Sequence, residues 1–375
     1  MKVEFYKHSL QDRDIQNVVD VLHSIFLTTG PVASDFEDKF SKLTGLRHTV
    51  ALNSCTAALH LALLALGIGP GDEVITTPMT FIATATAIIH TGAKAVFVDV
   101  DPDTGLIDPN LVESAITSET KAVMPVHLYG TMADMKALRD IANQHGLFII
   151  EDSAHCIEGE RDGVRPGYFS DAACYSFYAT KNLTCGEGGA LATNNEELAK
   201  KVRLLRQHGM SKEAADRYHG MYRHWDMVEL GWKYNLDDIH AALLINQIDR
   251  LGSCHEERMA IFKHYDESFR SVPGIEIPRR PGRSAVHLYS IWVDPKRRDE
   301  YLLSIQKRGV GVAVNYRAIH TLYYFREVWG LDPDNYPVAR RIGDRTISLP
   351  LYPRLTESEL KYVVETVREV VTGGS

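Results

Sequence analysis

The sequence lacks the features that direct a chain into a membrane or an oxidising compartment. Its longest apolar stretch, from Ala57 to Ile68, is interrupted by His60 and is too short to cross a bilayer. The first residues mix charges and have no apolar core, so they do not predict a signal peptide. Only five cysteines are present, an odd number without a CxxC pair, which favours reduced thiols in the cytoplasm.

The sequence also has no excess of positive charge and no cluster of metal ligands. Its 41 Lys and Arg residues face 49 Asp and Glu residues, a net charge of −8, which argues against a broad surface for nucleic acid. The 16 histidines form no HExxH motif and no Cys/His cluster, so we expect no metal site. No GxGxxG follows an early strand, which disfavours a nicotinamide-binding Rossmann enzyme.

The sequence does contain an alternation of buried strands and helices over its first two-thirds, which predicts a wound α/β sheet. Helical patterns lie at residues 56–66, 80–90, 109–115 and 134–144. Continuous apolar runs rich in Val and Ile predict strands at residues 48–53, 73–77, 95–100, 122–126, 147–151, 172–177 and 189–193.

The last third of the chain has a different pattern. A long helical stretch from Asp238 to about Phe269 ends at a Val-Pro-Gly stop. We therefore predict a large domain over residues 1–250, with an N-terminal arm over residues 1–30, and a smaller α+β domain over residues 251–375. In the smaller domain we expect strands at 288–293 and 310–315 and helices at 299–307 and 357–371.

Lys181 is the first candidate site residue. It follows the apolar run 172–178 and precedes the glycine-rich turn 186–189, where a planar ligand could approach closely. A lysine in this place is a candidate Schiff-base amine, which implies a carbonyl cofactor, most often pyridoxal 5'-phosphate (PLP). Taken alone, a lysine is more often a solvated surface charge.

A second candidate site lies where the strand 48–53 meets a helix. Ser54, Cys55 and Thr56 stand at the helix start, whose free N–H groups and hydroxyls suit a phosphate. The alternative is simple capping of the helix. Ser176, five positions before Lys181, could supply another hydroxyl.

Two further positions fit a flat, nitrogen-containing ring. Asp152 ends a buried strand, where a carboxylate can pair with a protonated pyridine nitrogen, and His155 follows three positions later. Phe81 comes just after another strand and could stack on the ring. The alternatives are that Asp152 caps a helix and that His155 and Phe81 belong to the core.

Taken in order, these motifs resemble those of the DegT/DnrJ/StrS group of PLP-dependent nucleotide-sugar aminotransferases. The matching segments are 53–57, 69–75, 151–155, 176–181, 186–189, 231–239 and 348–353. Within the group, the sequence is most similar to the UDP-4-amino-4-deoxy-L-arabinose aminotransferases, through residues 28–31, 207–209, 233–236 and 316–321. The resemblance implies fold-type I, with a mixed, mostly parallel seven-stranded sheet flanked by helices and a smaller C-terminal α+β domain.

The resemblance also implies roles for individual residues. Lys181 would form the Schiff base, Asp152 would contact the pyridine nitrogen, His155 would lie near the phenolic oxygen and Phe81 would stack on the ring. The phosphate would be bound by Ser54, Cys55, Thr56 and Ser176, with Asn235 of a neighbouring subunit completing the site, so a homodimer with shared active sites is implied. Substrate contacts would come from Tyr178, Arg317 and His320. Cys55 stands where glycine or alanine is more usual, and Asn315 where the arabinose-type pattern has histidine.

The activity implied by the resemblance is transfer of an amino group from L-glutamate to a UDP-linked 4-keto sugar, for cell-surface glycan or lipopolysaccharide synthesis. Alternatives are a 3-keto-sugar aminotransferase and a non-catalytic regulator with the same fold. A sugar dehydratase of this fold is disfavoured, because such relatives commonly have histidine in place of Lys181. The substrate diphosphate needs cations, which a basic stretch could supply unless it is only a solvated helix face: Arg203, Arg206, Lys212, Arg217 and Arg223.

Overall fold

The computed structural model describes residues 1–211 and 224–373. Its centre is a seven-stranded sheet in the order β1-β7-β6-β5-β4-β2-β3, in which only β7 runs antiparallel to its neighbours. All seven predicted strands are present, with ends shifted by up to three residues. The strands are β1 (His48–Leu52), β2 (Glu73–Thr76), β3 (Lys94–Phe97), β4 (Thr120–Val123), β5 (Phe148–Asp152), β6 (Ala172–Ser176) and β7 (Gly189–Thr193).

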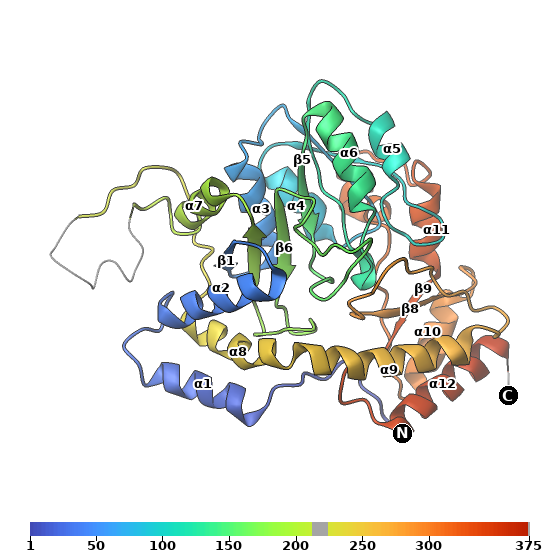
Figure 1. Cartoon of the computed structure of the whole chain (residues 1–375). Helices are drawn as coiled ribbons and strands as arrows, with labels where there is room; N and C mark the ends of the chain where they lie inside the picture. The colour runs from blue at the N-terminus through green and yellow to red at the C-terminus, as the bar shows by residue number, and fades with distance from the viewer. Residues whose placement is uncertain (212–223, 374–375) are drawn as a thin grey trace.

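Helices cover both faces of this sheet (Figure 1). Alternate strand residues such as Leu52 and Cys174 share a core with α3 (Cys55–Ala65). Their neighbours Ala51 and Tyr175 instead pack with α2 (Pro31–Thr44) and α8 (Asp238–Asp249). Because side chains alternate between two buried faces, the strands read as continuous apolar runs. The remaining helices of the large part are α1 (Asp12–Leu22), α4 (Ile82–His90), α5 (Pro109–Ser114), α6 (Met135–His145), α7 (Glu196–Leu205) and the short η1 (Leu128–Gly130).

The C-terminal part packs around a second, smaller sheet. In it β8 (Tyr289–Trp292) pairs antiparallel with β9 (Thr346–Leu349). The helices around this pair are α9 (Leu251–Phe269), α10 (Arg298–Lys307), η3 (Ile319–Thr321), η4 (Tyr324–Val328), α11 (Pro337–Arg345) and α12 (Glu357–Thr372). The predicted helices 299–307 and 357–371 are confirmed, and so is the strand expected at 288–293.

The strand expected at residues 310–315 is wrong. This segment makes only single bridges, from Val310 to Val3 and from Ala313 to Ser348. It passes from one partner to another within three residues, so neither ladder extends. Strand β9, by contrast, was not predicted from the sequence, because it is short and follows α11 directly.

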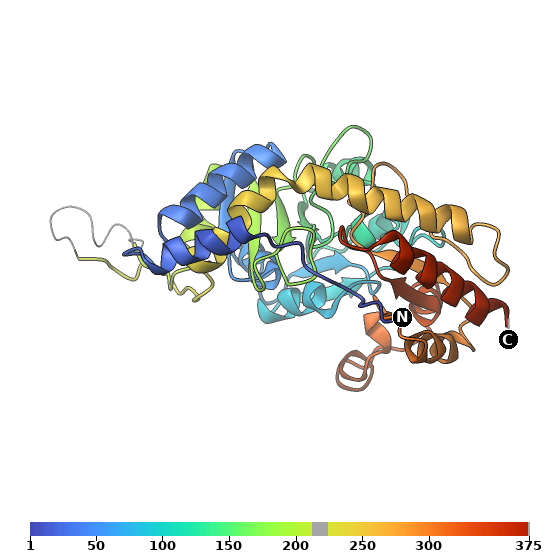
Figure 2. The ribbon, with the colours of Figure 1, turned by 90° about the horizontal axis from the view of Figure 1, so that it is seen from below.

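The N-terminal segment lies beside the C-terminal part rather than the large sheet (Figure 2). Val3 accepts a hydrogen bond from Gly311 and donates one to Gly309, both at 2.8 Å, and its side chain is buried in the C-terminal core. One residue, Arg250, separates α8 from α9. The domain division at residue 250 therefore falls between two successive helices and remains a prediction. Among the described residues, no helix combines the length and apolar character needed to cross a membrane.

Candidate active site

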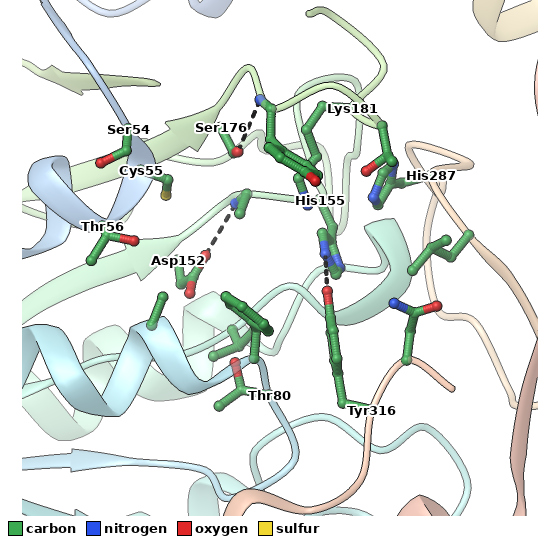
Figure 3. A pocket seen from close by; sticks show the side chains of 18 of the residues that line it. Ser54, Cys55, Thr56, Thr80, Asp152, His155, Ser176, Lys181, His287 and Tyr316 are labelled. Carbon is green, nitrogen blue, oxygen red and sulfur yellow. Dashed lines mark hydrogen bonds between the residues drawn. The ribbon is translucent and has the colours of Figure 1, made fainter. Parts of the chain in front are cut away.

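A cavity of about 510 Å³ lies at the carboxyl ends of the parallel strands, where ligands of wound α/β sheets usually bind (Figure 3). Strands β5 and β6 end in it at Asp152 and Ser176, and helix α3 begins at its edge. Most of the predicted site residues line this cavity. They are Ser54, Cys55, Thr56, Phe81, Asp152, His155, Ser176, Tyr178 and Lys181.

Lys181 stands just beyond the end of β6. Its backbone N–H donates to the Tyr178 carbonyl at 2.9 Å, and Tyr178 in turn bridges to Gly186 of the glycine-rich turn. Burial lowers the pKa of its amine to about 8, although the charges of Asp152 and Cys55 oppose this shift. Near neutral pH a larger fraction of this amine is therefore uncharged than in an ordinary lysine, and the uncharged form is the nucleophile for a carbonyl.

Asp152 is held in place by two hydrogen bonds. Thr84 of α4 donates its hydroxyl to Oδ2 at 2.7 Å, and the Ala154 N–H donates to Oδ1 at 3.1 Å. Burial raises the pKa of Asp152, while Thr84, Ala154 and Lys181 oppose that shift. A buried carboxylate of this kind suits a cationic N–H such as that of a pyridinium ring. Thr84 was not predicted from the sequence, although it stands one turn after Thr80 near the start of α4.

The start of α3 is built to receive an anion. Ser54 caps the helix by accepting the Ala57 N–H at 3.1 Å, so the capping role considered for it is confirmed. Cys55 and Thr56 follow in the first turn, where backbone N–H groups have no partner within the helix. At Gly189 a Cβ atom would lie 2.4 Å from the Cys55 nitrogen, so only glycine lets β7 begin this close to α3. A phosphate fits this helix start.

His155 belongs to an aromatic group that the sequence revealed only in part. Its Nε2 lies 3.1 Å from the Tyr316 hydroxyl, and its Nδ1 accepts the Tyr129 N–H at 3.3 Å. The ring of His287 is 4.5 Å from that of His155, and the ring of Phe81 is 5.6 Å from that of Tyr316. Tyr316 and His287 line the cavity although they are more than 100 residues away in sequence, so no local pattern links them to it.

Three predicted residues do not line the cavity. The Asn235 amide donates to the Thr29 hydroxyl at 2.6 Å, away from the cavity of its own chain. His320 is fully buried, with Nε2 at 3.0 Å from the Pro333 carbonyl. Arg317 is exposed. None of the three lines the cavity of its own chain, and the roles expected for them, in the case of Asn235 in the cavity of a neighbouring subunit, remain predictions.

The first two residues of the basic stretch, Arg203 and Arg206, have a structural role. Arg206 contacts Glu37 of α2 at 2.5 Å and the Ala51 carbonyl of β1 at 2.9 Å, and Arg203 contacts Glu37 at 3.3 Å. These arginines tie α7 to the sheet rather than facing the cavity. Lys212, Arg217 and Arg223 lie outside the described residues.

Together these features fit PLP. A lysine with a lowered pKa, a buried carboxylate and a helix start free to bind phosphate surround one cavity, with the half-exposed ring of Phe81 at its side. Among the described residues, no group of His, Cys, Asp and Glu side chains is arranged to hold a metal ion.

Comparison with known proteins agrees with this geometry. Residues 8–368 match the model of the DegT/DnrJ/EryC1/StrS aminotransferase family. The spore coat polysaccharide biosynthesis protein SpsC of Bacillus subtilis is 43% identical over 369 residues, covering 96% of this chain and 95% of SpsC.

Solved structures of sugar aminotransferases have the same fold. Spr1654 of Streptococcus pneumoniae, a candidate sugar aminotransferase solved in its PMP form, is 32% identical with a TM-score of 0.94, covering 99% of this chain and 100% of that one. PseC of Helicobacter pylori, an aminotransferase of pseudoaminic acid biosynthesis, is 28% identical with a TM-score of 0.92, and each chain is covered completely. The chain is thus a PLP-dependent aminotransferase with the fold of sugar aminotransferases, and it belongs to the DegT/DnrJ/EryC1/StrS aminotransferase family.

Proposed function

We propose that this enzyme transfers an amino group from L-glutamate to the 4-keto group of a nucleotide-linked sugar, with UDP as the expected nucleotide. The observation that carries the proposal is the placement of Lys181 and Asp152 in one cavity with an anion site. The names of SpsC and PseC place those relatives in spore-coat polysaccharide and pseudoaminic acid biosynthesis, respectively. A product used for cell-surface glycan or lipopolysaccharide synthesis is in keeping with them, and the arabinose-type substrate rests on sequence similarity alone.

In this proposal each residue of the cavity has a defined task. Bound PLP supplies an electron sink that acidifies the proton on the amine-bearing carbon. The amine of Lys181, with its pKa of about 8, accepts that proton in one half-reaction and returns it in the other. Asp152, fixed by Thr84, pairs with the ring N–H, and the first turn of α3 together with Ser176 binds the phosphate. Phe81 covers the ring, and Tyr178 lies within reach of the substrate.

We further propose that the enzyme acts as a homodimer in the cytoplasm, where five thiols stay reduced. Between α7 and α8 the structure describes residues 206–211 and 224–237, and the Val228 N–H donates a hydrogen bond to the Gly209 carbonyl at 2.9 Å. Residues 225–230 expose apolar side chains, among them Leu230, which is 70% exposed. Ile25, before α2, is 92% exposed. A second copy would cover these side chains, and its Asn235 would complete the phosphate site.

The test is an assay of the purified enzyme with L-glutamate and a panel of UDP-, GDP- and dTDP-linked 4-keto and 3-keto sugars. We expect glutamate-dependent amination at C4, with the highest kcat/KM for a UDP sugar. Amination at C3 would redirect the assignment to a 3-keto substrate. A cofactor that borohydride traps on Lys181 but that glutamate leaves unchanged would instead indicate a non-catalytic regulator.

A further inference from the structure

The residue next to the catalytic lysine fixes the orientation of a second imidazole. The Asn182 amide nitrogen donates to the Glu158 carboxylate at 3.0 Å and to the Ala285 carbonyl at 2.8 Å. Both partners only accept hydrogen bonds, so they require the NH₂ group of Asn182 on their side. The amide oxygen must then face His287, whose Nδ1 lies 3.2 Å away.

This contact determines which nitrogen of His287 carries the proton. An amide oxygen can only accept, so Nδ1 of His287 must be the donor. Burial, together with the charge of Lys181, holds the pKa of His287 well below its ordinary value, so the ring is neutral. A neutral imidazole has one ring proton, and Nε2 of His287 is therefore an acceptor.

His155, whose ring packs against that of His287, has the opposite tautomer. The Tyr129 N–H donates to its Nδ1, so its proton lies on Nε2 and points at the Tyr316 hydroxyl. In this pair of neighbouring rings, Nε2 of His155 is a donor that Tyr316 already engages, and Nε2 of His287 is an acceptor. The ion pair of Glu158 with Arg258 of α9, at 2.5 Å, holds the carboxylate that orients Asn182.

Lys181 is the donor that matches this acceptor. Within the described part of the chain, neither the amine of Lys181 nor Nε2 of His287 has a hydrogen-bond partner, and both side chains point into the same cavity (Figure 3). We propose that Nε2 of His287 accepts a hydrogen bond from the ammonium group of Lys181 whenever this lysine is not joined to the cofactor, and that Asn182 is the positioning residue that keeps this acceptor available. The inference rests on the role given to Lys181 in the proposed function.

The sign of the expected effect follows from the groups that face Lys181. Asp152 and Cys55 favour its charged form, and burial disfavours it. The Nε2 of His155 is engaged by Tyr316, and the polar lining of the cavity also includes Glu187, Tyr178 and Thr180. A neutral acceptor stabilises the ammonium form, so removing His287 should lower the pKa of Lys181.

The experiment follows PLP capture by the cofactor-free protein, without sugar or glutamate. The rate of Schiff-base formation, read from absorbance across a pH series, reports the fraction of Lys181 in the amine form. In His287→Phe we expect the midpoint of this profile to fall by about one pH unit. His287→Gln, which keeps an amide oxygen near the place of Nε2, should retain the wild-type midpoint. Equal midpoints in wild type and His287→Phe would overturn the inference, whereas failure of the wild type to capture PLP would overturn the proposed function itself.

A second measurement tests the tautomer in the unaltered protein. Ring-nitrogen NMR of histidine-labelled protein should show a neutral His287 with its proton on Nδ1, its signal being assigned by its loss in His287→Gln. A proton on Nε2 of His287 would contradict the inference. In Asn182→Ala, where the oxygen that fixes the ring is gone, we expect a mixture of the two tautomers.

Discussion

At the scale of single residues, the lowered pKa of Lys181 links the chemistry to stability. The pKa of Lys181 is about 8 in the folded protein without cofactor, whereas the ordinary value for a lysine, expected in the unfolded chain, is 10.5. Between these values the unfolded chain binds more protons, so this group makes stability rise with pH through that window. We expect Lys181→Met to raise the Tm of cofactor-free protein by a few degrees below pH 8, and this gain to shrink toward pH 10.5. Thermal melts across a pH series, with the exposed Lys121→Met as control, would show this pH-dependent gain in Tm. A gain that is independent of pH would contradict the lowered pKa of Lys181.

Thr84 is the residue whose hydroxyl holds Asp152 in place. In Thr84→Val the shape is kept but the carboxylate loses one of its two donors, so the pKa of Asp152 should rise further and its pairing with the ring nitrogen should weaken. We expect kcat to fall roughly tenfold with PLP still bound. The matched control is Thr86→Val on the same helix, because among the described residues the Thr86 hydroxyl bonds only to the Ala83 carbonyl. Equal kcat values for Thr84→Val and wild type would show that Asp152 needs no such support.

At the scale of secondary-structure elements, the contact between β7 and α3 shapes the phosphate site. In Gly189→Ala the new methyl would lie 2.3 Å from the Ser54 carbonyl carbon and would push the start of α3 away. We expect a loss of about 2 kcal/mol in unfolding free energy and a weaker affinity for PLP. Gly252→Ala on α9 is the control: a Cβ there meets nothing within 4 Å, so the change should leave the affinity for PLP unchanged and should not lower the unfolding free energy. Denaturation and PLP titration of the two variants would test this. A Gly189→Ala variant as stable as the wild type and with the same affinity for PLP would contradict the expected displacement of α3.

Some of these elements and site residues could be predicted from the sequence and others could not. The seven strands were predictable because a strand buried on both faces leaves a continuous apolar run, as at residues 172–177. The strand expected at 310–315 failed because pairing depends on partners from Val3 and Ser348, far away in the chain. Lys181 and Asp152 were found because each ends its own strand, whereas His287 and Tyr316 reach the cavity only through the packing of the C-terminal part.

At the scale of the whole molecule, the exposed apolar side chains predict a dimer on which the active site depends. Leu230→Asp places a charge among them, so we expect the mass in solution to fall from dimer to monomer and the affinity for PLP to fall roughly tenfold or more. Leu303→Asp on α10, also exposed, is the control and should change neither. Light scattering with PLP titration tests this. A Leu230→Asp variant that is monomeric yet binds PLP as tightly as wild type would contradict shared active sites.

In the proposed function, Lys181 moves the proton in amination of a nucleotide-linked 4-keto sugar. The most direct test supplies ¹⁵N-labelled L-glutamate and a UDP-linked 4-keto sugar to wild type and to Lys181→Ala, and follows the label by NMR. We predict that wild type places ¹⁵N on C4 of the sugar, and that Lys181→Ala folds and dimerises but transfers label at least about 100-fold more slowly. Transfer by Lys181→Ala at the wild-type rate, or no labelled sugar from wild type with any 4-keto substrate, would contradict the claim.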